Sequence, residues 1–314
     1  MSKDASFRRA EDSDLRPAYA VFRRSLLDYL LRLAVIDEET AKNDSVDAAW
    51  QRQSQWIVHL WNTAAENWVA VDASGAVIGW AMSVARDGHL ELTHFFVEPG
   101  IQSKGVGRGL IECAFPGRPG LRKSIAATQD PRALSLYLRA GVNYVTTAGE
   151  FVLAPRRRAP AADIAFQNVK PTDESVEAIA GIERGVLGFR RDADIRFLLG
   201  QRPAWLALRD GEPVGFAFGA QSGATGDAGL PAPSGPMAAL DPNDVPALID
   251  HVTSEAEKSG IGDISVLAPF ANQSAVRHLL ARGAKIDPFY IKVLASDGDM
   301  KLDRWLHTMP MFIL

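Results

Sequence analysis

The chain has 314 residues, of which 47% are hydrophobic and 23% are charged, and this composition indicates a soluble globular protein long enough for two domains. Its 34 basic and 38 acidic residues give a formal net charge of -4, so charge provides no reason to expect nucleic acid or an anionic membrane as a partner. The single cysteine, Cys113, excludes internal disulfides and cysteine-rich zinc sites.

The start of the chain carries no targeting signal. The segment before Phe7 lacks the apolar core of a secretory signal peptide. No run in the chain reaches the roughly 18 apolar residues that a membrane span needs. We therefore expect a cytoplasmic protein with no membrane partner.

Two helices are predicted behind a short first strand at Phe7–Ala10. Asp12 or Ser13 can cap the first helix, in which apolar residues recur at the spacing of an amphipathic helix. The second helix spans about Val46–Thr63 and carries several aromatic residues. We expect most of these rings to be core, with one or two bordering a substrate site.

Three antiparallel strands lead from these helices into a glycine-rich loop. Trp68–Val71 and Val77–Val84 flank a turn that contains glycine, which predicts a hairpin, and Leu90–Val97 predicts the third strand. Gln102–Gly109 is rich in glycine and precedes apolar residues at helical spacing. Glycines let a ligand approach the backbone, and the first N–H groups of a helix carry a partial positive charge. The sequence therefore predicts a phosphate-binding corner.

Strand, loop and helix together resemble motif A of the GCN5-related N-acetyltransferases, the GNAT family. The resemblance rests on the strand end Val97-Glu98-Pro99 and on the pattern Gln-x-x-Gly-x-Gly that begins at Gln102. A P-loop does not fit, because no Gly-Lys-Ser/Thr follows, and a dinucleotide fingerprint with its acidic residue is absent. In the GNAT family this loop holds the pyrophosphate of acetyl-coenzyme A.

A second resemblance to the family follows the short strand predicted at Ser124–Thr128. Asp130 is a good N-cap and Gly141 ends the predicted helix. Ala133, Tyr137 and Gly141 match motif B of the GNAT family, whereas Asp130 stands where the family usually has Asn. This departure puts a side-chain contact to the pantetheine arm of the coenzyme in doubt.

The resemblance implies a complete acetyl-CoA site in the first half of the chain, with no metal ion. Backbone N–H groups of Lys104–Arg108 would bind the pyrophosphate, and the main chain of Phe95 and Val97 would pair with the pantetheine amides and stabilise the oxyanion. The residues assigned to the coenzyme are Phe95, Phe96, Val97, Gln102, Lys104, Gly105, Val106, Gly107, Arg108, Asp130 and Tyr137.

Tyr137 is the expected general acid, because GNAT enzymes use a phenol at this position to protonate the departing thiolate. The alternative is a core tyrosine with its hydroxyl satisfied. Strand alternation predicts Glu91 and Phe95 on one face and His94 on the other. Glu91 stands where some GNAT enzymes carry a base, and apolar neighbours would raise the pKa of its carboxyl group toward neutrality. A Glu91 that pairs with a basic residue is equally open, and His94 is the fallback base.

Residues 163–297 repeat the first half of the chain. Trp205 and Ala207 echo the first hairpin, and Asn272 recurs at the position of Asp130. The second copy lacks the glycine loop, and Leu279 stands at the tyrosine position. It is therefore expected neither to bind the coenzyme nor to catalyse.

The expected fold class is α/β (α+β), with two tandem GNAT-like folds that each have a mixed, mostly antiparallel sheet flanked by helices. The loop predicted at Gln221–Pro236 belongs to the second fold. The apolar tail is expected to pack on its own chain or on a partner subunit, which would allow a homodimer. The expected boundaries are a catalytic domain at 1–155 that ends in a strand at Glu150–Ala154, a linker at 156–162, a degenerate domain at 163–297 and the tail at 298–314.

The leading hypothesis is an acetyl-CoA-dependent N-acetyltransferase that acetylates a primary amine of a small molecule or a protein by direct attack in a ternary complex. The alternative is a non-catalytic acyl-CoA-binding sensor or partner-binding protein. A third hypothesis, in which the acceptor is a sugar amine linked to a thiol, has no motif of its own in the sequence.

Overall fold

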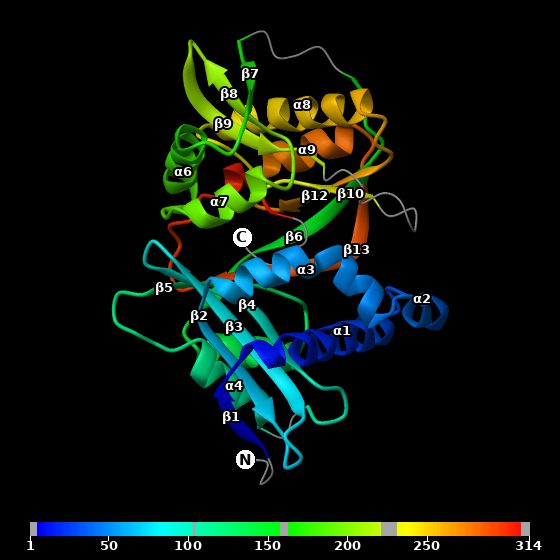
Figure 1. Cartoon of the computed structure of the whole chain (residues 1–314). Helices are drawn as coiled ribbons and strands as arrows, with labels where there is room; N and C mark the ends of the chain where they lie inside the picture. Colours follow the sequence, from blue (N-terminus) through cyan, green and yellow to red (C-terminus); the bar gives the residue numbers. More distant parts are fainter. Residues whose placement is uncertain (1–4, 103–104, 158–162, 221–230, 309–314) are drawn as a thin grey trace. The chain divides into compact units, whose positions relative to one another are not determined.

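The computed structural model describes residues 5–102, 105–157, 163–220 and 231–308 (Figure 1). The chain forms two compact units. Unit 1 consists of Met1–Tyr144 and Leu294–Asp297, and unit 2 consists of Val145–Val293 and Gly298–Leu314. Within the described residues, no helix is long and apolar enough to cross a bilayer.

The described part of unit 1 contains the four predicted helices and a short one, α2 (Glu38–Asn43), that the sequence did not indicate. The first helix is preceded by a 3₁₀ turn over Asp12–Asp14, so Asp12 and Ser13 lie in this turn and do not cap the helix itself. Ser45 caps the third helix by accepting a hydrogen bond from the Ala48 amide at 3.1 Å. The helices of unit 1 are α1 (Leu15–Arg32), α2 (Glu38–Asn43), α3 (Val46–Asn62), α4 (Val106–Ala114) and α5 (Pro131–Arg139).

The three predicted antiparallel strands form β2, β3 and β4 of the sheet of unit 1. In addition, β1 pairs antiparallel with β2, and β5 pairs parallel with β4. Its strands are β1 (Ser6–Arg9), β2 (Ala64–Val71), β3 (Val77–Arg86), β4 (His89–Val97) and β5 (Arg122–Ala127). Figure 1 shows α1 and α3 (blue) crossing β2, β3 and β4. Four aromatic and aliphatic side chains of α3 are buried, which confirms them as core: Trp56, Ile57, Leu60 and Trp61.

A β-bulge in β4 changes which residues share a face. Leu92 pairs with Ser83 and His94 pairs with Met82, so Thr93 is an extra residue between two successive pairs. Such an insertion shifts the alternation of side chains by one position. Leu92 and Val97 therefore belong to the same apolar cluster beneath α4. The bulge places Glu91 and Phe95 on opposite faces, so the prediction that they share a face is wrong. The sequence contains no local signal that marks the bulge.

The other face of β4 packs against α1. The rings of His94 and Phe96 lie 5.6 and 4.7 Å from the ring of Phe22. Pairing of β4 with β5 extends only from His89 to Leu92. Beyond the bulge the two strands separate, and this separation creates the space described below.

Unit 2 repeats the pattern of unit 1. The second hairpin and the helix after Asn272 form as the repeat predicts, and Gly141 and Gly283 both end their helices with positive φ angles of 87° and 81°. The helices of unit 2 are α6 (Asp173–Leu187), α7 (Asp192–Leu199), α8 (Val245–Lys258) and α9 (Gln273–Ala281). Its strands are β7 (Ala165–Val169), β8 (Ala204–Arg209), β9 (Glu212–Phe218), β10 (Ala232–Ser234), β11 (Met237–Ala239), β12 (Ile264–Pro269) and β14 (Trp305–Leu306).

Two strands, β6 (Asn143–Leu153) and β13 (Lys285–Ala295), have residues in both units. Residues 148–153 of β6 pair antiparallel with β12, so the strand expected to end the first domain lies in unit 2. Near the end of β13, the Ser296 amide donates a hydrogen bond of 2.9 Å to the Lys123 carbonyl within unit 1. The first segment of unit 1 therefore ends at Tyr144 and not at the expected residue 155. The reason is that each strand belongs to the unit in which it finds its pairing partner, whatever its place in the chain.

Several expected segments fall partly outside the described residues. Positions 158–162 of the linker, 221–230 of the predicted loop and 309–314 of the tail are among them. Positions 231–236 of the same predicted loop contain strand β10, which pairs in parallel with β12. The described part of the tail packs on its own chain, because Trp305 and Leu306 are completely buried.

Candidate active site

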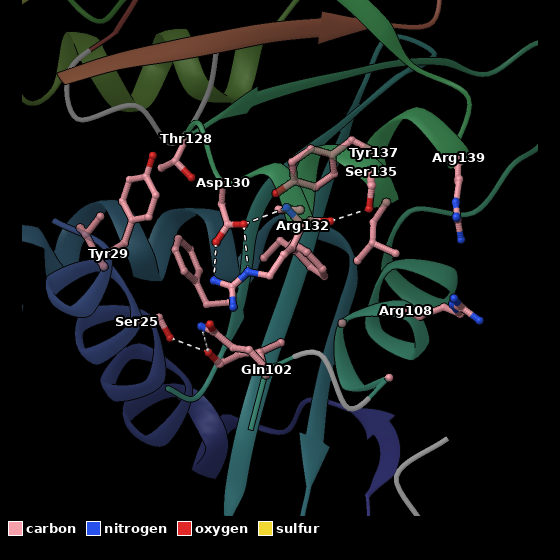
Figure 2. Close-up of a pocket in the computed structure, with 18 of the residues that line it drawn as sticks. Ser25, Tyr29, Gln102, Arg108, Thr128, Asp130, Arg132, Ser135, Tyr137 and Arg139 are labelled. Atoms are coloured by element: carbon pink, nitrogen blue, oxygen red, sulfur yellow. Dashed lines mark hydrogen bonds and ion pairs between the residues drawn. The ribbon is translucent and has the colours of Figure 1, made fainter. Parts of the chain in front are cut away.

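Unit 1 contains a partly open cavity of about 400 Å³ where β4 and β5 separate (Figure 2). The walls come from the end of β4, the glycine loop, the start of α4, Thr128 directly after β5, and helices α5 and α1. Lys104 lies outside the described residues, and Val106 is buried in the apolar core instead. The cavity brings together the other residues assigned to the coenzyme: Phe95, Phe96, Val97, Gln102, Gly105, Gly107, Arg108, Asp130 and Tyr137.

The glycine loop ends at the N-terminus of α4. Gly105 occupies the N-cap position with a φ of 91°, and no side chain among the described residues caps the helix there. Glycine has no side chain with which to cap these N–H groups, and free N–H groups at a helix start are the local condition for anion binding. Gly109 has a different reason to be glycine, because a Cβ there would lie 2.3 Å from the ring of Phe7.

The last residues of β4 present main-chain groups to the cavity side. The Glu98 amide donates to the Ile78 carbonyl of the neighbouring segment at 2.9 Å. Antiparallel alternation then directs the groups of Phe96 toward β3 and those of Phe95 and Val97 away from it. Phe96 thus contributes its ring and not its main chain to the cavity.

The carbonyl oxygen of Val97 already has two donors. The Ser25 hydroxyl donates to it at 2.9 Å and the Gln102 side-chain amide at 3.1 Å. Both lone pairs of this oxygen are therefore engaged within the protein. Gln102, predicted to contact the coenzyme, orients the end of the strand, and the groups directed to the ligand side are the main chain of Phe95 and the N–H of Val97.

Tyr137 lies in α5 and faces the cavity. Its side chain is 6% exposed and packs edge-on to Phe95, with ring centroids 5.7 Å apart. Burial, together with the charge of Asp130, raises the pKa of the Tyr137 phenol above its ordinary value. The hydroxyl therefore carries its proton throughout the neutral range.

Asp130 caps α5 and forms an ion pair that sequence reasoning missed. Its carboxylate accepts from the Arg132 amide at 2.9 Å and from the Arg132 guanidinium at 3.1 and 2.6 Å (Figure 2). Partial burial acts to raise the pKa of Asp130, but the hydrogen bonds and charge of Arg132 outweigh it and hold the pKa below its usual range. The sequence signal that could have predicted this ion pair is an acidic N-cap residue with an arginine two positions later.

The charges around the cavity favour an anionic ligand. Arg32, Arg108, Arg132 and Arg139 line it, against the single carboxylate of Asp130. Figure 2 shows Arg108 and Arg139 near each other, apart from the Asp130–Arg132 pair. No ion pair joins either of these two arginines to another described residue. Their charge is therefore available to a ligand, although the chain as a whole is acidic.

Comparison with known proteins assigns this part of the chain to a family. Residues 30–142 match the model of the acetyltransferase (GNAT) family. Residues 30–142 of unit 1 therefore hold a GNAT-family domain. No curated protein sequence matches the chain significantly.

Solved GNAT structures share the fold over almost the whole chain. A Pyrococcus horikoshii protein described as an acetyltransferase has a TM-score of 0.65 and 13% identity, covering 96% of this chain and 93% of that protein. A GCN5-related N-acetyltransferase from Sphaerobacter thermophilus has a TM-score of 0.58 and 15% identity, with 93% and 95% covered. A tandem GNAT protein from the clavulanic acid biosynthesis pathway has a TM-score of 0.55 and 14% identity, with 94% and 98% covered. The chain therefore has the expected tandem GNAT fold.

The two candidate bases of this GNAT domain are not among the residues that line the cavity. Glu91 is 4% exposed in the part of β4 that precedes the bulge. His94 is stacked on Trp80 with ring centroids 4.3 Å apart, and burial lowers its pKa to about 3. His94 is therefore a neutral core residue, and a catalytic role for Glu91 stays a prediction. Among the described residues, no group of three or more His, Cys, Asp or Glu side chains could hold a metal ion.

Proposed function

We propose that the chain is an acetyl-CoA-dependent N-acetyltransferase in which unit 1 transfers an acetyl group to a primary amine of a small molecule or protein. The observation that carries the proposal is the combination of three features in one cavity. These are a helix N-terminus with glycine at its N-cap beside arginines, main-chain groups at the end of a diverging strand, and a protonated phenol. Anion binding, amide pairing and proton donation are the three tasks that a thioester of coenzyme A requires.

The residues fit a long, polyanionic thioester. The N–H groups at the start of α4, together with Arg108 and Arg139, would hold its phosphates. The main chain of Phe95 and the N–H of Val97 would pair with its amides as an added strand does. Arg132 uses part of its guanidinium on Asp130 and directs the rest to the cavity, where it would take the place of the usual asparagine amide as donor.

Tyr137 supplies the proton that the departing thiolate needs when the amine attacks the thioester carbonyl. Burial disfavours the phenolate and the thiolate alike, so the transfer is less uphill than the solution pKa values suggest. The amine must lose its own proton, and Glu91, acting directly or through water, is the proposed acceptor.

One observation favours the alternative of an acyl-CoA-binding protein without turnover. Neither Glu91 nor His94 lines the cavity, and a binding protein needs no base. The two functions share the coenzyme site and differ only in the chemistry. Thiol release from acetyl-CoA across a broad panel of amines separates them.

Binding itself is tested by thermal denaturation with and without acetyl-CoA. A ligand at about 100 times its dissociation constant stabilises the folded protein by about 2.7 kcal/mol. Gly105→Glu should abolish this stabilisation, because it places a carboxylate at the anion corner. Gly75→Glu is the matched control, since Gly75 has a similar positive φ of 86° in unit 1 with nothing near its missing Cβ. A wild-type protein that saturating acetyl-CoA does not stabilise refutes both functions.

A further inference from the structure

The second unit contains the counterparts of the strands that open the cavity in unit 1. β11 precedes Asp241-Pro242 and α8, as β4 precedes Glu98-Pro99 and α4. β12 precedes α9, as β5 precedes α5. In unit 1 the space between the two strands is the proposed coenzyme cavity. In unit 2 the corresponding space is occupied by the C-terminal segment, Trp305–Thr308.

This segment bonds to both strands at once. Leu306 pairs with Met237 and Trp305 pairs with Ala238, both antiparallel, on β11. On the other side, the His307 amide donates to the Leu267 carbonyl of β12 at 2.9 Å. An extended peptide thus joins two strands that do not pair with each other directly. All four residues of the segment are at most 1% exposed.

The residues around the segment are those that face the cavity in unit 1. Asn272, the counterpart of Asp130, is fully buried and donates its side-chain amide to the Trp305 carbonyl at 3.3 Å. Leu279, the counterpart of Tyr137, is fully buried and has no proton to give. The motif position that lines the cavity in unit 1 therefore holds a peptide carbonyl in unit 2.

Two further contacts fit the unit to this peptide. A Cβ on Gly235 would lie 2.5 Å from the His307 carbonyl oxygen, so no side chain fits at this position. The guanidinium of Arg191 lies 5.2 Å from the centre of the Trp305 ring and donates to the buried Glu183 carboxylate at 2.6 Å. Such a cation over an aromatic face is attractive, above all where both are buried.

We propose that the cleft of unit 2 is a strand-binding site whose ligand is the chain's own C-terminal segment, Trp305–Thr308. The segment lies in the space that corresponds to the cavity of unit 1. Unit 2 is therefore closed to the coenzyme by an internal peptide, in addition to lacking the glycine loop. A chain with both units folded therefore binds a single coenzyme molecule. This stoichiometry rests on the proposed function, whereas the contact between the segment and unit 2 does not.

Hydrogen exchange on the full-length protein tests the peptide contact directly. Gly235→Ala should accelerate exchange of the amides in the C-terminal segment by on the order of tenfold or more, because the new methyl group displaces His307. Gly211→Ala is the control, since Gly211 has a φ of 85° in unit 2 and nothing near its missing Cβ. Equal protection of the segment in both variants overturns the proposal.

A second experiment supplies the segment from outside. A chain that ends at Arg304 should lose thermal stability and regain it with a synthetic peptide of residues 305–314, but not with the same peptide carrying Trp305→Ala. A truncated chain as stable as the full one overturns the proposal, and if that chain does not fold, the exchange result decides alone. Two bound coenzymes per full-length chain in a calorimetric titration also overturn it. Absence of any coenzyme binding refutes the proposed function and leaves the exchange prediction intact.

Discussion

Replacement of Tyr137 by phenylalanine tests the proposed general acid with little disturbance of the fold. Tyr137 and Tyr29 both line the cavity (Figure 2), and their hydroxyl groups differ in their hydrogen-bond partners. The Tyr29 hydroxyl accepts a hydrogen bond from the Gln129 amide at 2.9 Å. No other described residue shares a hydrogen bond with the Tyr137 hydroxyl. Each substitution therefore removes one phenolic hydroxyl group from the cavity wall, but the expected losses of stability and of activity differ.

The magnitudes follow from these contacts. Tyr29→Phe leaves the Gln129 amide without its acceptor and should cost about 1 kcal/mol of stability, which lowers the melting temperature by about 2–4 °C. Tyr137→Phe removes no bond within the described protein, so its stability should stay within about 0.5 kcal/mol of wild type. Loss of a general acid lowers kcat by about 100- to 10,000-fold. Tyr137→Phe should therefore be stable and slow, and Tyr29→Phe less stable and nearly as fast.

Steady-state thiol release and denaturant titrations measure the two effects. The pH profile adds an independent check, because burial and Asp130 raise the pKa of Tyr137 above its ordinary value. Deprotonation of this phenol should cause no loss of kcat between about pH 8 and 10. A Tyr137→Phe protein that keeps the wild-type kcat refutes the assignment of the acid. A falling kcat in that pH range shows that another group gives the proton.

Two further predictions concern the scaffold of the site. Lys123→Met should destabilise the protein by about 2 kcal/mol in urea titrations. The buried ammonium of Lys123 donates a hydrogen bond of 2.6 Å to the Ala140 carbonyl at the end of α5 and lies 4.3 Å from the centre of the Phe115 ring. A variant as stable as wild type would show that the ammonium contributes no stability. His94 is neutral when folded, because burial lowers its pKa to about 3. Since the unfolded chain binds the proton at a pKa of about 6.5, stability falls as the pH drops from 6.5 toward 3, by about 2 kcal/mol at pH 5 from this residue. His94→Phe should flatten this acid dependence between pH 7 and 5, and an unchanged slope would contradict the prediction.

Local features of the sequence determined the elements of the site. A strand end, a run of glycines and an apolar helix are contiguous, so the sequence alone indicated the corner beside Gly105. The same holds for α5, whose cap at Asp130 and end at Gly141 are separated by one helix length. The repeat was also visible, because equal spacings recur along the chain. The corner and the helix each depend on residues close together in the sequence, where propensity and capping act. The repeat needs only a comparison of one half of the chain with the other.

The tertiary structure decided what depends on distant partners. The bulge at Thr93 reversed the faces of β4, and only pairing with β3 reveals it. Strand β6 joined β12 instead of closing the first unit, and Trp305 entered the cleft of the second unit. A strand carries its hydrogen-bonding groups on both edges whatever its sequence, so its choice of neighbour follows from the burial and pairing of the whole sheet.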